Sequence, residues 1–336
     1  MPLHAVLVSG PIGPDTIDLP GEPARLREAV QGLRDLTRQL GQVSEQLQQA
    51  NPPQGSRGRT VLALSRGAQR AGTALEADAR QLGELADSIE GAADALAQGQ
   101  DGLDGLRQRW RAARQGLRQA LQDAKGGPHD PGALIRRIDA HTAEPHDAQF
   151  RRQAGLSFTD GGGGAQAEAM LLEQGGALQQ AIGEYRREVR GIVDEYADLM
   201  QQAKNADNDV DRRLPRRAEA SLGAVRGDGS GEPSPEISSP EAVQSLGEQL
   251  LDAAKALGQA ADRLEDIRLA IRAGRMLPEE DRVGSNNGFK RDWTEHFESV
   301  RESLTAGRRA ADTAADRLRQ ADDDSAADIR QALRGH

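Results

Sequence analysis

The chain has 336 residues and a net charge of −10, with 2% aromatic residues and no cysteine. The negative charge disfavours nucleic acid and anionic membranes, and the lack of cysteine excludes disulfides and thiolate metal sites. No apolar run is long enough to span a bilayer, and the opening MPLHAVLVSG lacks the features of a secretory signal peptide. The abundance of Ala, Leu, Arg, Gln and Glu predicts an all-α fold.

The scarcity of aromatic residues favours elongated antiparallel helical hairpins, like those of coiled-coil bundles, over a wide globular core. Residues 1–20 hold four prolines without a helical period, and we interpret them as an extended segment. A helix is predicted over residues 23–50 from its apolar stripe. Asn51–Gly58 breaks it, because two prolines and two glycines cannot continue a helix. The helix that follows should therefore return antiparallel to the first.

That second helix carries an apolar repeat of seven residues over positions 61–124, which is typical of a coiled-coil seam. Its members are Val61, Ala68, Leu75, Leu82, Ile89, Leu96, Leu103, Trp110, Leu117 and Ala124, with Asp78 as a charged member of the second, offset series. Glycines cluster in Gly99–Gly105, and we expect the helix to bend there without ending. The part around Trp110 extends past the reach of the first helix. We expect it to pack against the helix of Tyr185 and Tyr196.

The predicted helices beyond the repeat form a long middle helix and a second hairpin. The middle helix spans about 165–214, and GDGSGEPSPEISSP, which ends at Pro240, is typical of a flexible linker. Apolar stripes then predict two helices, over about 243–271 and 289–333. The predicted organisation is an extended segment, a hairpin, an irregular segment with the middle helix packed on that hairpin, a linker and a second hairpin, with boundaries 1–20, 21–125, 126–214, 215–240 and 241–336.

Catalytic and ligand-binding signals are weak. His129 to Asp147 contains histidines and carboxylates that are able to bind a metal, but their spacing matches no standard site. Gly161–Gly164 precedes a helix without the strand or the lysine of a phosphate-binding loop, which favours a hinge. Five arginines surround Trp110, but Trp110 occupies a seam position, so we expect it to be buried and the arginines to face solvent. We predict no cofactor, no metal and no nucleic-acid partner.

One aromatic cluster stands out in the last hairpin. Phe289, Trp293 and Phe297 recur every four residues on one helix face. Such a face packs as core against Ile267 and Ile271, or it forms an anchor for a partner helix, where Trp is favoured. We take these three residues as candidates for partner binding.

Two stretches resemble the WXG100-like and LXG-like helical hairpin proteins of actinobacterial ESX (type VII) secretion. LPGEPARLREAVQGLRDL (Leu19–Leu36) resembles the opening of their N-terminal domains, and Glu84–Trp110 is similar to their second helix. The Trp-x-Gly turn of the family is missing, with Ser56-Arg57-Gly58 at its position. The export signal Tyr-x-x-x-Asp/Glu is also missing, and its nearest analogue runs from Leu318 to Asp322.

The resemblance implies a non-enzymatic protein, a secretion substrate or accessory carrier that pairs with a helical partner, for which a small WXG-like protein is the candidate. It also implies a chain that is cytoplasmic before export and is secreted by a Sec-independent route, with the missing export signal supplied by a partner. The alternatives are a cytoplasmic coiled-coil scaffold unrelated to secretion, including a homo-oligomer, and a metal-dependent enzyme that uses His129 to Asp147.

Overall fold

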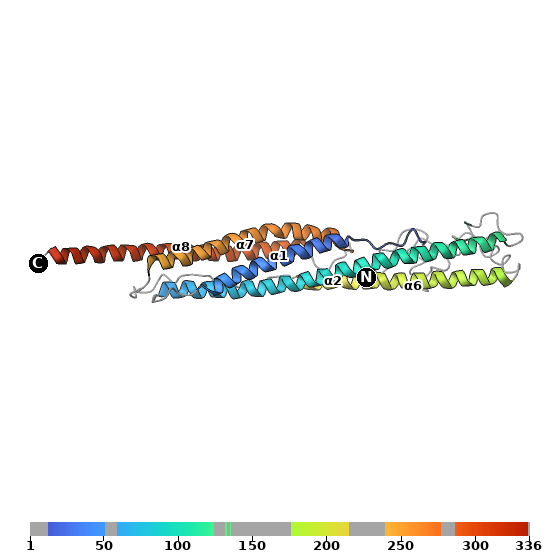
Figure 1. Cartoon of the computed structure of the whole chain (residues 1–336), viewed down its shortest axis with the longest axis horizontal. Helices are drawn as coiled ribbons and strands as arrows, with labels where there is room; N and C mark the ends of the chain where they lie inside the picture. The colour runs from blue at the N-terminus through green and yellow to red at the C-terminus, as the bar shows by residue number, and fades with distance from the viewer. Residues whose placement is uncertain are drawn as a thin grey trace. The chain divides into compact units, whose positions relative to one another are not determined.

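The computed structural model describes residues 13–50, 59–123, 132, 135, 176–214, 239–276 and 286–334. Within these ranges the chain is all-α and contains no strand, which confirms the predicted fold class. None of the helices there is long and apolar enough to cross a membrane. The helices, labelled as in Figure 1, are α1 (Pro23–Gln48), α2 (Arg59–Asp123), α6 (Gly176–Arg213), α7 (Pro240–Gly274) and α8 (Asn286–Arg334).

The chain forms two compact units. Unit 1 consists of Met1–Pro23 and Ala92–Asp207, and unit 2 of Ala24–Gly91 and Asn208–His336. The pairing of α1 with the first part of α2 and the hairpin of α7 and α8 both fall in unit 2, whereas the second part of α2 falls in unit 1. The physical reason lies in α1, whose buried positions include the neighbouring pairs Ala29–Val30 and Val43–Ser44. A stripe of that width contacts more than one neighbouring helix, and the Gln39 side chain donates a hydrogen bond to the carbonyl of Ala256 in α7 at 3.0 Å.

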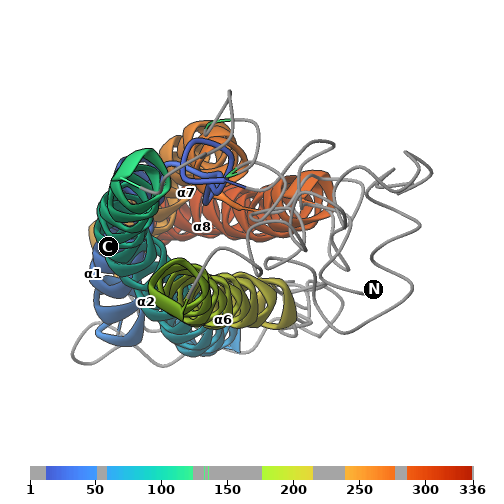
Figure 2. The same ribbon diagram turned by 90° about the vertical axis from the view of Figure 1, so that its right-hand side faces the viewer.

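The first hairpin of unit 2 pairs α1 with the first part of α2, and Figures 1 and 2 show the two helices side by side. Near the middle of α1, Arg34 forms an ion pair with Glu90 at 2.6 Å. Near its end, the Ser44 hydroxyl donates to the carbonyl of Gly72 at 2.8 Å. The later residue of α1 contacts the earlier residue of α2, so the two helices are antiparallel, as the short connection between them predicted.

Two glycines of α2 offer a matched test of this contact. A Cβ at Gly72 would lie 2.8 Å from the Ser44 carbonyl oxygen, whereas at Gly91 nothing lies within 4 Å. We expect Gly91→Ala to stabilise unit 2 by about 0.5–1 kcal/mol, the ordinary gain of Ala over Gly within a helix. Gly72→Ala should instead lower the stability of unit 2, because the added Cβ forces backbone atoms of α1 to move. Urea unfolding followed by circular dichroism measures both, and equal stabilisation would contradict the close contact.

The second hairpin of unit 2 is the antiparallel pair of α7 and α8 (Figures 1 and 2). α7 begins where the Ser239 hydroxyl accepts a hydrogen bond from the Ala242 amide at 3.2 Å, with Pro240 in the first turn. Arg319 reaches Gln244 at 2.6 Å near one end of the pair, and Lys290 reaches Glu265 at 2.8 Å near the other. The predicted second hairpin is therefore present in the structure.

Two polar pairs are buried inside unit 2. The imidazole Nε2 of His296 in α8 lies 2.8 Å from the Asp78 carboxylate of α2, and their side chains are 10% and 2% exposed. This contact explains why a charged residue occupies the seam of α2. Arg275, which follows α7, contacts Asp211 of α6, and these side chains are 0% and 3% exposed. Both pairs join parts of the chain that are far apart in the sequence.

Unit 1 is built from the second part of α2 and most of α6, which run antiparallel. α2 continues as one helix through Gly99–Gly105, so these glycines do not interrupt it. Two of them instead admit a neighbouring side chain. A Cβ at Gly99 would lie 2.8 Å from Leu19 Cδ1, and a Cβ at Gly102 would lie 3.2 Å from Leu199 Cδ1 of α6. These two glycines thus permit close packing against two neighbours, Leu19 and Leu199 of α6.

Candidate functional site

The aromatic cluster of α8 lies inside unit 2. Phe289, Trp293 and Phe297 are 2%, 0% and 1% exposed, and the Trp293 ring centroid lies 6.4 Å and 5.4 Å from those of its two neighbours. Ile267 and Ile271 of α7 are also buried. A partner helix cannot reach side chains that the chain itself already covers. The expectation that these three residues form a partner surface is therefore corrected, and they act as core.

The analogue of the export signal lies near the end of the paired part of α8. Leu318 is half-buried and Asp322 is exposed. From Arg319 to Gln331 every residue is exposed except Ala326, which is half-buried. We call residues 320–331 the free segment of α8, because no other described element covers them, and Figure 1 shows this red end of the ribbon running on alone.

The cluster around Trp110 is organised as the sequence predicted. Trp110 is fully buried, and its indole N–H donates to the hydroxyl of Tyr185 in α6 at 3.3 Å. Arg109 pairs with Glu195 at 2.7 Å and with Glu188 at 2.9 Å, and its hydrogen bonds to these carboxylates raise its pKa. Because acidic residues of the same unit neutralise this arginine, it does not add to a free basic surface for nucleic acid.

Residues 13–22, which we call the strap, form a site that the sequence did not predict. The strap begins with a short turn, continues without helix and lies on α2 and α6. Four hydrogen bonds hold its backbone carbonyls. Gln100 of α2 donates to those of Leu19 and Gly21 at 3.1 and 3.0 Å, Arg107 to that of Ile17 at 2.8 Å, and the Tyr196 hydroxyl of α6 to that of Asp18 at 2.9 Å. Burial raises the pKa of Tyr196, so this hydroxyl stays a donor.

Side chains of the strap alternate between the two surroundings. Ile17 and Leu19 are 1% and 2% exposed, whereas Asp18 between them is exposed. Asp15 forms an ion pair with Arg111 at 2.6 Å, and this hydrogen bond lowers the Asp15 pKa. We call the receiving surface the strap groove and define it by Gly99, Gln100, Arg107, Arg111 and Tyr196. The only signal in the sequence was the alternation of Ile17, Asp18 and Leu19, which is short even for a strand.

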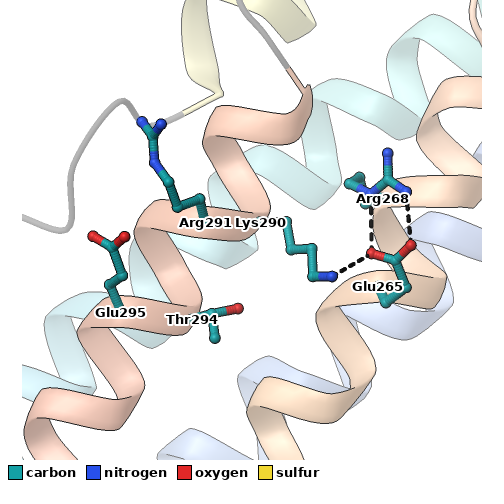
Figure 3. Close-up of a pocket in the computed structure, with 6 residues that line it drawn as sticks. All are labelled: Glu265, Arg268, Lys290, Arg291, Thr294 and Glu295. Carbon is teal, nitrogen blue, oxygen red and sulfur yellow. Dashed lines mark hydrogen bonds and ion pairs between the residues drawn. The ribbon is translucent and has the colours of Figure 1, made fainter.

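A shallow pocket of ≈ 460 Å³ lies on the surface between α7 and α8. Figure 3 shows Arg268 and Lys290 both pointing at Glu265, while Arg291 and Glu295 point away from it. Arg268 and Lys290 contact the Glu265 carboxylate at 2.6 and 2.8 Å, and the hydrogen bond from Arg268, followed by that from Lys290, lowers the Glu265 pKa to about 2. Two of the three cations that line the pocket thus already face the Glu265 carboxylate. We interpret this cluster as an ion-pair network that joins the two helices.

The metal-binding candidates His129 to Asp147 and the glycines Gly161–Gly164 lie outside the described residues. Among the residues that the structure does describe, no three His, Asp or Glu side chains are grouped so as to hold a metal ion.

Comparison with known proteins gives no assignment: no family model, curated protein sequence or solved structure matches the chain. The resemblance to proteins of type VII secretion therefore stays a prediction.

Proposed function

We propose that the chain is a non-enzymatic adaptor that works by pairing a helix with a helical protein partner. The observation that carries this proposal is the free segment of α8. Isolated helices shorter than about 12–15 residues are marginal in water, because most helical stability in proteins comes from tertiary packing. Residues 320–331 lack such packing among the described elements, so a helical partner along them would stabilise this part of α8. The segment carries Ile329, which is 61% exposed, on one face.

The charge of the free segment specifies the partner. Between positions 320 and 331 the segment has one basic residue, Arg330, and four acidic residues: Asp322, Asp323, Asp324 and Asp328. An apolar residue among acidic ones suits a helix that presents small apolar residues flanked by Lys and Arg, because complementary charge fixes partner choice and register. The finer form of the proposal follows the resemblance of Leu19–Leu36 and Glu84–Trp110. In that form the partner is a small WXG-like protein, and the complex is a substrate or carrier exported by type VII secretion without a signal peptide.

Co-expression with the small helical protein encoded beside the gene, where one is present, tests the proposal. We expect a stable complex in size-exclusion chromatography with light scattering. Ile329→Asp should weaken it at least tenfold, because it places a charge in the pairing face. Leu269→Asp is the matched control, since Leu269 of α7 is exposed to 46% and lies outside the free segment. Equal loss in both variants would contradict pairing through α8, and self-association alone would favour the scaffold alternative.

A further inference from the structure

We propose that the strap groove is a docking site for an extended peptide segment, and that its occupant in trans is the strap of a second copy of this chain. The inference does not depend on helix pairing by α8. It rests on the way in which the groove binds residues 13–22, which the structure shows in cis.

The groove recognises features that any copy of the strap presents. Gln100, Arg107 and Tyr196 bind backbone carbonyls, and such contacts hold an extended segment whatever its origin. Selectivity comes from the side chains. Leu19 fits against Gly99, where a Cβ would approach it to 2.8 Å, and Arg111 pairs with Asp15. The sequence that satisfies all of these contacts is carried by every copy of the chain.

The junction between the strap and α1 is suited to exchange. Gly21 has a φ of 116°, a left-handed conformation that favours glycine, and α1 begins two residues later at Pro23. Rotation at this one residue redirects the strap while the hydrogen bonds of α1 stay intact. Exchange of an identical segment between copies loses no contact, which is why it is an accessible route to dimers.

Tethering favours the cis arrangement in dilute solution. The strap belongs to the same chain as its groove, and a segment tethered in this way experiences an effective concentration of up to about millimolar. At micromolar concentration each copy therefore keeps its own strap, and exchange becomes dominant when the cis interaction is blocked or when copies are concentrated on a common partner. The groove is thus an interaction surface that the strap of the same chain occupies until the local concentration of copies is high enough for exchange.

Two full-length variants separate the strap from the groove. Ile17→Asp with Leu19→Asp disables the strap and leaves the groove intact. Gly99→Leu fills the space that Leu19 occupies and leaves the strap intact. Gly105→Leu is the control for the latter, because it makes the same change in α2 at a position where nothing lies within 4 Å of the added Cβ.

We expect the strap-defective and groove-defective copies to form a 1:1 complex by light scattering, although neither pairs through the strap groove alone. When Gly105→Leu copies replace the groove-defective ones, the same complex should form only at a concentration at least tenfold higher, because the Gly105→Leu copy keeps its own strap bound in cis. A labelled peptide of residues 13–22 should bind the strap-defective chain and not the Gly99→Leu chain.

Circular dichroism verifies that each variant is helical. If the double variant Ile17→Asp with Leu19→Asp loses its helicity, Leu19→Ala takes its place. Folded strap-defective chains that bind neither the peptide nor the groove-defective copy would overturn the docking site. Peptide binding without a complex between the two copies would overturn the second copy as its occupant.

Discussion

Replacement of Arg275 by methionine is expected to lower the free energy of unfolding by about 3–5 kcal/mol, because it leaves the Asp211 carboxylate buried without its charge partner. The Arg275 side chain is 0% exposed and that of Asp211 is 3% exposed. The second carboxylate oxygen, Oδ2 of Asp211, has no hydrogen-bond partner in the described part of the chain. Water cannot compensate a carboxylate at this depth, so the loss should be large. Urea unfolding at neutral pH measures it.

The control for this substitution is Arg212→Met in the same helix as Asp211. The Arg212 side chain is 78% exposed and pairs with Asp209 at 3.0 Å, so its loss should change stability by at most about 0.5–1 kcal/mol. The double variant Arg275→Met with Asp211→Leu should recover much of the stability, since apolar replacements of a buried pair are often neutral. A loss below about 1 kcal/mol for Arg275→Met would show that solvent reaches the pair.

Trp293→Ala is expected to destabilise unit 2 by about 3–5 kcal/mol through the cavity that it leaves. Trp293 is 0% exposed and contacts Phe289, His296 and Phe297 through its ring. Trp293→Phe should cost much less, about 1.5 kcal/mol. Its indole N–H has no hydrogen-bond partner among the described residues, so Phe leaves no buried acceptor unsatisfied. Thermal or urea unfolding distinguishes the two variants.

The matched surface substitution is Ile329→Ala on the same helix, which should alter the free energy of unfolding by about 0.5 kcal/mol or less. Together these variants separate core from surface on α8. If Trp293→Ala reduced binding to a helical partner while the free energy of unfolding stayed unchanged, the core interpretation of the aromatic cluster would be wrong.

The periodic parts of the fold were predictable from the sequence. The seven-residue repeat of α2 and the apolar stripes of α1, α7 and α8 specify helices and their buried faces, and the short connection after α1 specifies an antiparallel neighbour. The pairing of the Trp110 part of α2 with the helix of Tyr185 was also predicted, because the seam of α2 continues past the length of α1. These features depend on local spacing, which the sequence states directly.

The remaining features depend on which residues meet across long separations. The sequence placed Asp78 in an apolar seam without indicating His296, which lies 218 positions away. The sequence did not predict the strap groove. Leu19 packs against Gly99 because glycine has no side chain there, but a glycine within a helix can equally indicate a bend, so its presence does not point to a neighbour. For the aromatic cluster, spacing alone does not distinguish a buried face from a partner surface, and only the burial decides it.

The division of the chain has a consequence for folding during synthesis. Unit 1 combines Met1–Pro23 with Ala92–Asp207, and unit 2 combines Ala24–Gly91 with Asn208–His336. The hydrogen bond to the Asp18 carbonyl cannot form until Tyr196 is synthesised, 178 positions later. The hydrogen bond of Gln39 likewise needs the Ala256 carbonyl, 217 positions later. At a ribosomal rate of about 5–20 residues per second, the face of α1 that packs on α7 is exposed for roughly ten seconds or more before α7 emerges. Its apolar stripe needs temporary protection in that interval, either from α2 or from a chaperone.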